Sequence, residues 1–360
     1  MPDGRRFRIL VINPGSTSTK IAAYLDDCAE MSETLRHSGE EMAPYRGRPV
    51  LDQIAWRAGV IESALGRAGI SEDSFDAVAG RGGLLPPLAS GTYLVNDRML
   101  EELRLARRGE HASNLGACLA QAIAARAGVA AYVVDPVSVD EWEPVARVSG
   151  CALIDRECLW HALNSKAVAK RYARERGVPY ESLRLVVAHI GGGASISVHR
   201  GGLGVDVINP REEGPFSMDR AGGVPVLKLA NLCFSGQHRL ADIERMLFGE
   251  GGVYSHLGTK DLIEVERRIA QGDERARLVF EAMAYQIAKA IGAMATVLHG
   301  RIDAVLLTGG MAHSSRLVEA IRGSVAWIAP LAIYPGEDEM QALAEGVLRV
   351  LRGEEQARQF

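Results

Sequence analysis

The chain contains two stretches in which a short apolar run is followed by a turn of small residues and a second apolar run. Residues 8–26 read RILVINPGSTSTKIAAYLD, and residues 183–201 read LRLVVAHIGGGASISVHRG. In each stretch the pattern predicts a buried strand, a tight turn and a second strand that returns beside the first.

The two stretches align with each other. When His189 is placed under Asn13, Gly191 falls under Gly15, at an offset of 176 residues. A chance match is the alternative explanation. A true repeat predicts two similar α/β units, each opening with a hairpin around a turn rich in glycine, serine and threonine.

The rest of the chain alternates between helical and strand patterns. Apolar residues at helical spacing predict helices over residues 51–68, 99–107, 114–126, 273–299 and 339–352. Short apolar runs predict strands at residues 131–135, 302–308 and 326–328. Such alternation favours α/β architecture.

Composition narrows the class of protein. A chain of 360 residues with 47% hydrophobic residues favours two globular domains of roughly 150–180 residues. A net charge of −4 argues against nucleic acid as the main partner. No apolar run approaches the roughly 18 residues of a membrane span, and the apolar stretch near the N-terminus is too short for a signal peptide. Five cysteines without a CxxC pair fit reduced thiols, so we expect a cytoplasmic location and no membrane partner.

The first turn, NPGSTSTK at residues 13–20, is dense in hydrogen-bond donors. It combines hydroxyl groups, backbone amides and the only lysine of the first 165 residues. Phosphate oxygens favour such donors, although the order of residues is not that of a P-loop. An ordinary hairpin turn with polar residues is the alternative. The candidate phosphate ligands are Asn13, Ser16, Thr17, Ser18 and Lys20.

Two further glycine turns suit a nucleotide. One follows His189, and the other follows Thr308 at the end of a predicted strand. A dehydrogenase-type dinucleotide loop would open a helix, whereas residues 195–198 alternate like a strand, which weakens that interpretation. Glycine lets backbone amides approach an anion closely. The candidate nucleotide ligands are His189, Gly191, Gly192, Gly193, Gly309 and Gly310.

The motifs ILVINPGSTSTK (9–20) and HIGGGASISVHRGG (189–202) resemble those of the acetate and butyrate kinase family, within the actin/hexokinase/heat-shock ATPase superfamily. The resemblance covers essentially the whole chain, because shorter pieces follow in the family order. They are GRGG (80–83), EHASNL (110–115), VD (134–135), WHALN (160–164), GPFSMDRAG (214–222) and TGG (308–310).

The resemblance implies an α/β fold of two duplicated ribonuclease-H-like (actin-like ATPase) domains with a cleft between them. An N-terminal domain for acyl substrate and phosphate would span residues 1–137 plus 338–360, and a C-terminal nucleotide-binding domain would span 138–337. The implied reaction is reversible transfer of the γ-phosphoryl group of ATP to a carboxylate, with ATP/ADP and Mg²⁺ as cofactors. The implied partners are a small carboxylate or acyl phosphate and further copies of the chain, in a dimer or larger homo-oligomer.

Details resemble the butyrate kinase branch of the family. The chain is shorter than acetate kinases typically are, and ALNSK follows His161 where acetate kinases carry a second histidine. Gly82-Gly83-Leu84 follow Arg81, where acetate kinases usually have two valines and a histidine. Smaller side chains predict room for a longer acyl tail, each buried CH₂ contributing roughly 0.8 kcal/mol.

The resemblance also implies catalytic roles. Arg81 matches the arginine that binds the carboxylate, and its planar fork suits that partner. His161 and Arg220 match groups that stabilise the transition state. Asp135 matches an essential aspartate, and His111 a histidine on the substrate side. From the residue types alone, surface ion pairs, a buried histidine and a helix-start residue remain alternatives.

Asn13 and Glu339 are the candidate Mg²⁺ ligands. Both offer oxygen atoms, and Mg²⁺ usually takes only one or two ligands from protein. Asp338 is adjacent, so the sequence leaves open which acid is nearer the metal. The helix dipole alone would also favour an acid at this position.

The sequence is also compatible with three other functions. An acetate, propionate or sugar kinase of the same superfamily is one; a sugar kinase could use Asp135 as base but would leave Arg81 without a purpose. A non-catalytic, ATP-gated module like actin is the second, and a nicotinamide-dependent dehydrogenase the third.

Overall fold

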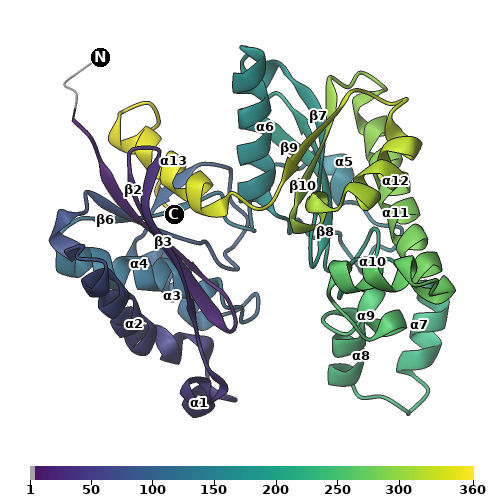
Figure 1. Cartoon of the computed structure of the whole chain (residues 1–360), viewed down its shortest axis with the longest axis horizontal. Coiled ribbons are helices and arrows are strands. Elements are labelled where there is room, and N and C mark those ends of the chain that lie inside the picture. Colours follow the sequence, from purple (N-terminus) through teal and green to yellow (C-terminus); the bar gives the residue numbers. More distant parts are fainter. Residues whose placement is uncertain (1–4) are drawn as a thin grey trace. The chain divides into compact units, whose positions relative to one another are not determined.

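The computed structural model describes residues 5–360, which divide into two compact units (Figure 1). Unit 1 comprises the chain up to Asp140 together with Asp338–Phe360, and unit 2 comprises Glu141–Glu337. Each unit is built on one twisted sheet.

Unit 1 has a six-stranded sheet in the order β3-β2-β1-β4-β6-β5. Its strands are β1 (Arg8–Pro14), β2 (Ser18–Leu25), β3 (Cys28–Arg36), β4 (Ala77–Gly80), β5 (Thr92–Leu94) and β6 (Ala130–Val134). Its α-helices are α1 (Gly39–Met42), α2 (Ile54–Arg67), α3 (Asp97–Leu105), α4 (Asn114–Ala127) and α13 (Glu339–Leu351). Strands β1, β4 and β6 run parallel, whereas β2 and β3 are antiparallel to their neighbours.

Unit 2 has a five-stranded sheet in the order β11-β10-β7-β8-β9. Its strands are β7 (Arg184–Ile190), β8 (Ala194–Arg200), β9 (Leu203–Ile208), β10 (Ala304–Gly309) and β11 (Leu331–Pro335). Its α-helices are α5 (Pro144–Arg147), α6 (Ala162–Arg176), α7 (Val226–Cys233), α8 (Leu240–Leu247), α9 (Gly252–Leu257), α10 (Leu262–Ala270), α11 (Glu274–Ala295) and α12 (Ser315–Val325).

Five strands of each sheet share one topology, which confirms the predicted duplication; the edge strand β5 of unit 1 has no counterpart in the sheet that the structure describes for unit 2. In each, the first strand and the two strands that follow it in the chain form an antiparallel meander, and two parallel strands extend the sheet on the other side of the first strand. The offset is 176 residues in the first strand, where Asn13 matches His189. It is 175 after the turn, where the cross-strand partners Lys20 and Ser195 match. The register of the next strand pair shifts at the equivalent point in both units.

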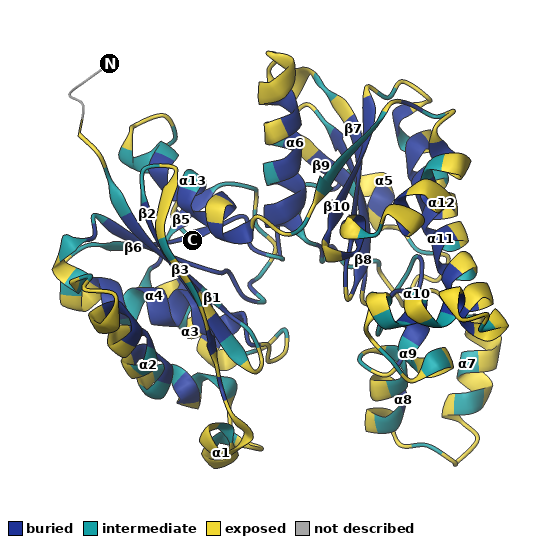
Figure 2. Ribbon diagram, in the orientation of Figure 1, coloured by how far each residue is buried: buried dark blue, intermediate teal, exposed yellow. Residues whose placement is uncertain are grey.

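Each sheet is covered on both faces. In unit 1, Leu10 and Ile12 point into a core formed with α2 and α4, while α13 covers the opposite face. In unit 2, Val186 and Ala188 pack toward α11 and α12, while Leu185 packs toward α6. Figure 2 shows the central strands of both sheets as buried. Asn13 and His189 therefore lie on equivalent faces, toward α13 and α6.

Most predicted elements are present near their predicted bounds. The strand predicted at residues 326–328 is wrong: this segment follows α12 as a turn, and the strand is β11, a few residues later. Residues 326–328 and 331–334 are both apolar, so the apolar pattern alone does not show which of the two segments forms the strand.

One helical segment is an exception to the expectation that no stretch is apolar enough to cross a membrane. Residues Glu274–Leu298, which include α11, pass that test by length and composition. Half of their most apolar window is buried inside the structure, where Met283, Ile287 and Ile291 belong to the core of unit 2. A core helix of a globular domain passes the same test, so this is weak evidence for a membrane span.

Candidate active site

The turn between β1 and β2 presents different residues on the two faces of the unit 1 sheet. Asn13 and Lys20 are cross-strand partners, so their side chains share the face that α13 covers. Thr19 is fully buried on the opposite face. The amide of Gly15 donates a hydrogen bond of 2.8 Å to the carbonyl of Ser18, which closes the turn.

Most of the predicted phosphate ligands in this turn are accessible. Ser16, Thr17 and Lys20 are exposed, and Ser18 is half-buried. A ligand can therefore reach their hydroxyl and ammonium groups.

Asn13, Arg81 and Glu339 meet in unit 1. Asn13 Nδ2 donates a hydrogen bond of 2.8 Å to Glu339 Oε2, and Arg81 Nη1 forms an ion pair with Glu339 Oε1. Both charged residues are buried, each 8% exposed. The backbone positions Arg81 just after β4, where its amide donates to the carbonyl of Ile12 on β1 (2.9 Å). Glu339 reaches the same place as the first residue of α13.

Asn13 and Glu339 carry oxygen atoms of the kind that Mg²⁺ binds. The described residues contain no group of three or more acidic, histidine or cysteine side chains that would form a protein cage. Asn13 Oδ1 is not used in the bond to Glu339, so the two residues offer adjacent oxygen atoms, and Mg²⁺ commonly takes only one or two such ligands.

The glycines after Arg81 do not leave open space, which corrects the expectation of a larger acyl pocket there. A Cβ on Gly83 would lie 2.4 Å from Asn114 Oδ1 and 2.7 Å from Asn114 Cα. A Cβ on Gly82 would lie 2.3 Å from Pro136 Cβ. These glycines are needed because Pro136 and Asn114 approach them closely, so valine at either position would clash rather than fill a vacant volume.

Asp135 and His111 are each held by hydrogen bonds to neighbouring residues. Asp135 follows β6 in a left-handed conformation with φ of 38°, and its Oδ1 accepts hydrogen bonds from Ser90 Oγ (2.6 Å) and Gly91 N (2.8 Å). His111 is exposed, and its Nδ1 lies 2.8 Å from Ser113 Oγ and accepts from Ser113 N at 3.2 Å. The proton of a neutral His111 ring is therefore on Nε2.

In unit 2 the rings of His161 and His189 stack, with centroids 3.8 Å apart and planes 9° from parallel. His161 Nδ1 lies 2.8 Å from Ser195 Oγ. His189 Nδ1 lies 2.9 Å from Asn164 Oδ1, and because an amide oxygen only accepts, this ring nitrogen carries a proton. His189 Nε2 lies 3.1 Å from a carboxylate oxygen of Glu337. The Nδ1 atom of each ring is thus fixed by a polar neighbour, Ser195 for His161 and Asn164 for His189.

Arg220 lies against the glycine turn between β7 and β8. A Cβ on Gly193 would come within 2.5 Å of Arg220 Nη1, so the guanidinium can take this position only beside glycine. Its other side lies over the ring of Phe248, 4.5 Å from the centroid. Burial lowers the pKa of Arg220 from its ordinary value, although Asp219 nearby opposes the shift.

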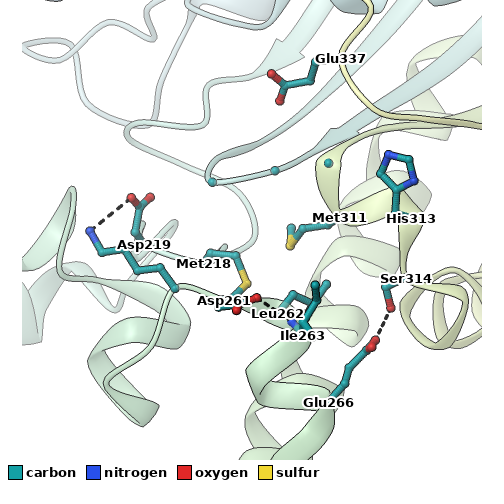
Figure 3. Close-up of a pocket in the computed structure, with 14 residues that line it drawn as sticks. Met218, Asp219, Asp261, Leu262, Ile263, Glu266, Met311, His313, Ser314 and Glu337 are labelled. Atoms are coloured by element: carbon teal, nitrogen blue, oxygen red, sulfur yellow. Dashed lines mark hydrogen bonds and ion pairs between the residues drawn. The ribbon is translucent and has the colours of Figure 1, made fainter. Parts of the chain in front are cut away.

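A cavity of about 610 Å³ opens beside the same turn. Figure 3 shows apolar side chains from three segments around it, with an ion pair of 3.6 Å between Asp219 and Lys260 at one side. A hydrogen bond between Ser314 and Glu266 lies at another side. The lining residues include Gly191, Gly192, Met218, Leu262, Ile263, Gly310 and Met311. Gly310 adjoins Gly309, whose φ is 92° and whose Cβ, if present, would lie 2.3 Å from the carbonyl oxygen of Ile190.

The structure thus groups the predicted residues within each unit. Asn13, Arg81 and Glu339 form one group in unit 1. In unit 2, the two histidines form one group, and the turns at 191–193 and 309–310 adjoin a cavity. Sequence analysis missed the partners that hold these groups: Ser195, Asn164 and Phe248. Ser195 and Asn164 lie inside quoted motifs, and Ser195 is a polar residue in a buried strand, which was the available signal.

Comparisons with known proteins agree on one family. A model described as the acetokinase family matches residues 155–333. Butyrate kinase 1 of Clostridium acetobutylicum is 49% identical over 355 residues, which cover 98% of this chain and 99% of that protein. Among solved structures, Porphyromonas gingivalis acetate kinase superposes with a TM-score of 0.77 at 19% identity, covering 96% of this chain and all of that one. A propionate kinase from Francisella tularensis gives 0.76 at 18% identity, covering 94% and 98%. The structural likeness supports a two-domain, actin-like fold.

Proposed function

The chain belongs to the acetokinase family, and on this premise we propose that it transfers the γ-phosphoryl group of ATP, reversibly, to butyrate or a similar short- or branched-chain fatty acid. The enzyme is a phosphotransferase that accepts a carboxylate; the choice of acyl chain is the finer part of the proposal. That part rests on the 49% identity to a butyrate kinase along nearly the whole chain.

The chemistry requires charge compensation rather than a strong base. A fatty acid has a pKa near that of glutamate, so the nucleophilic oxygen is already ionised at pH 7. The difficulty is that an anionic acceptor must approach an anionic phosphate. Fixed cations and hydrogen-bond donors lower this barrier by stabilising the charge that spreads over the transferred group.

Unit 1 would bind the acyl substrate and phosphate. The observation that supports this best is Arg81, a buried guanidinium whose ionic partner among the described residues is the carboxylate of Glu339. We infer that Arg81 binds the substrate carboxylate while Glu339 holds the guanidinium in place. Lys20 and the hydroxyl groups of residues 16–18 would bind phosphate oxygens from the exposed turn.

Asn13 and Glu339 would hold Mg²⁺, which when bound with ATP supplies positive charge that offsets the phosphates. Asp135, fixed by two hydrogen bonds in a conformation that is rare for a residue with a side chain, would orient groups through water. His111 would donate from Nε2 on the substrate side.

Unit 2 would bind the nucleotide. The cavity beside the glycine turn offers apolar side chains for a base and backbone amides of Gly191 and Gly192 for phosphate. His161 and Arg220 would donate to the phosphoryl group in the transition state, and His189 would support His161 by stacking.

A hydroxamate assay with ATP, Mg²⁺ and unbranched and branched C2–C6 carboxylic acids tests the proposal. We expect acyl hydroxamate to form, with the highest kcat/KM for butyrate or a close analogue. Preference for acetate or propionate would overturn the acyl-chain assignment. ATP turnover that carboxylates leave unchanged would favour a non-catalytic, actin-like module, which the family membership does not favour.

We also propose that the enzyme acts as a cytoplasmic homo-oligomer of two or more copies, as the family resemblance implies. Light scattering after size-exclusion chromatography of the purified protein tests the assembly, and a mass of one chain would contradict it.

A further inference from the structure

Arg57 is a buried arginine that lies behind the β1–β2 turn. It belongs to α2 and is 1% exposed. Its Nη1 contacts the carbonyl oxygens of Gly15 and Ser18 at 2.9 and 3.0 Å and Thr19 Oγ1 at 2.9 Å. Its Nη2 contacts the carbonyl of Ser16 at 3.2 Å. One guanidinium therefore holds three peptide carbonyls of the turn.

The guanidinium is itself fixed by Gln53, the residue before α2, and Thr19 is held in turn by His37, the residue after β3. Gln53 Oε1 accepts from Arg57 Nε and Nη2 at 3.0 and 2.8 Å. His37 Nε2 lies 2.9 Å from Thr19 Oγ1, and the amide of His37 donates to the carbonyl of Thr17 at 2.9 Å. These contacts form a buried polar network on the face of the sheet opposite to Lys20.

The network carries a positive charge without a carboxylate against it. No ion pair joins Arg57 to an acidic side chain of residues 5–360; its acceptors there are neutral oxygens. Burial lowers the pKa of Arg57 to about 10, so the group remains charged at neutral pH. A buried charge is costly unless something compensates it. Carbonyl dipoles do so in part, and an anion in the adjacent turn would add to their effect.

The contacts also determine which way the turn presents its donors. The turn contains no cis peptide bond, and in a trans peptide the N–H of one residue points opposite to the C=O of the residue before it. Because the carbonyls of Gly15 and Ser16 point at Arg57, the N–H groups of Ser16 and Thr17 point away from it. Successive N–H groups oriented this way form a concave binding site for an anion.

We propose that Arg57 is a positioning residue for phosphate binding: it draws the carbonyls of Gly15 and Ser16 inward so that the N–H groups of Ser16 and Thr17 face the phosphate. This rests on the proposed function of the turn. Arg57 does not contact the substrate in this role, because it is buried on the far face. Its effect passes through the backbone of the turn and through its charge.

Three variants separate geometry, charge and general stability. Arg57→Met removes both the hydrogen bonds and the charge, and Arg57→Lys keeps the charge without the fork. Ile61→Ala is the matched control, because Ile61 is fully buried on the same helix and packs in the apolar core. Melting temperatures identify conditions under which all variants are folded. Hydrogen exchange followed by mass spectrometry on the peptide covering residues 13–20 reports the turn without requiring activity.

We expect Arg57→Met to speed amide exchange in this peptide and to lower kcat/KM for ATP by about 10²-fold, because small displacements of binding groups have effects of that size. The KM for butyrate should change by no more than about twofold, because Arg57 takes no part in binding the acid. Arg57→Lys should recover only part of the loss. Added guanidinium ion should partly restore Arg57→Met and should not help Ile61→Ala.

Two results would overturn the proposal. One is exchange and ATP kinetics in Arg57→Met that match those of Ile61→Ala at equal stability. The other is faster exchange of the turn while ATP kinetics stay at the wild-type level. If the wild-type enzyme formed no acyl phosphate, the proposed function would fail instead. Amide exchange in the presence of inorganic phosphate would then show whether Arg57 prepares the turn for an anion. If phosphate failed to slow exchange in residues 13–20 of the wild type, that result would contradict the proposal.

Discussion

The β1–β2 turn of unit 1 and the β7–β8 turn of unit 2 occupy equivalent places in the duplicated sheets, yet they are stabilised in different ways. In unit 1, Arg57 lies behind the turn and binds its carbonyls, so the cation is buried. In unit 2, Arg220 lies against Gly193, and Ser217 Oγ bonds the carbonyl of Gly192. The turn of unit 1 is stabilised by a buried arginine, whereas the turn of unit 2 lines a cavity through Gly191 and Gly192 and has an arginine packed against Gly193.

The equivalent side chains differ as well. Lys20 in unit 1 matches Ser195 in unit 2, which holds His161 rather than reaching solvent. Asn13 matches His189, and each is bonded to a residue in the first turn of the covering helix, Glu339 or Asn164. The duplication therefore preserves where functional groups are placed while their chemistry has diverged: oxygen ligands and a lysine in one unit, stacked imidazoles in the other.

The largest effects should come from the cationic and imidazole groups of unit 2. We expect His161→Ala and Arg220→Ala each to lower kcat by about 10²–10³-fold with smaller changes in KM, as for loss of one preorganised donor. Because both would act on one phosphoryl group, the double variant should lose less than the product of the single losses. Steady-state kinetics with circular dichroism controls measure this. A folded His161→Ala protein with wild-type kcat would remove His161 from the reaction.

Alanine at one glycine of each turn would sharpen the comparison of the two turns, although Gly15 and Gly193 are not at equivalent positions. In Gly193→Ala the new Cβ would lie 2.5 Å from Arg220 Nη1, whereas in Gly15→Ala it would lie 3.4 Å from Ser18 Oγ. Displacement of Arg220 should lower kcat by about 10²-fold, while Gly15→Ala should remain within a few-fold of wild type. Comparable losses in both variants would show that the turns tolerate side chains equally and that Arg220 does not depend on Gly193.

The equivalent positions Lys20 and Ser195 should give separable kinetic effects. Lys20→Ala should weaken use of ATP with every acid tested, by about 10-fold or more, since a charge-assisted contact is worth roughly 1.5–3 kcal/mol. Ser195→Ala removes one neutral hydrogen bond from His161 and should lower kcat by only about 3–10-fold. Initial rates over a matrix of ATP and butyrate concentrations distinguish them. If the KM for ATP and the kcat of Lys20→Ala both stay within about twofold of the wild-type values, the lysine does not bind phosphate.

The smallest expected effect concerns the pH dependence of stability. It arises from His199, which occupies the position equivalent to Tyr24 of unit 1. Burial lowers the pKa of His199 from 6.5 to about 3, and Lys166 adds to the shift. Below pH 6.5 the unfolded chain binds a proton that the folded chain does not, so this group makes stability fall as the pH drops from 6.5 toward 3. The expected loss is about 1 kcal/mol between pH 7 and pH 5.5.

Urea unfolding of the wild type and His199→Gln at these two pH values measures that contribution. The hydrogen bonds of His199 to Tyr180 and Ser197 mean that the variant starts less stable, so only the difference between the two pH values is informative. An equal pH dependence in both proteins would show that His199 does not contribute to acid sensitivity.

Sequence patterns predicted the elements of the site better than its contacts. The hairpins at 8–26 and 183–201 and the helices near 54–67, 114–127 and 339–351 were predicted because apolar periodicity is local and survives in the fold. The expected pocket beside Gly82 and Gly83 was wrong for the opposite reason. Whether a glycine leaves space depends on what packs against it, and here Pro136 and Asn114 fill that space.

By itself, the sequence determined the duplicated hairpins, their glycine-rich turns and the family to which the chain belongs, because each of these depends on residues that are adjacent in the sequence. Only the tertiary structure decided that Glu339 meets Asn13, 326 residues away, and that Arg57 lies beneath the turn of residues 15–19. Such contacts depend on which helix covers which face of a sheet, and packing between distant segments sets that arrangement. A charged residue on the apolar face of a helix indicates that it has a buried partner, but the sequence of the chain does not identify that partner.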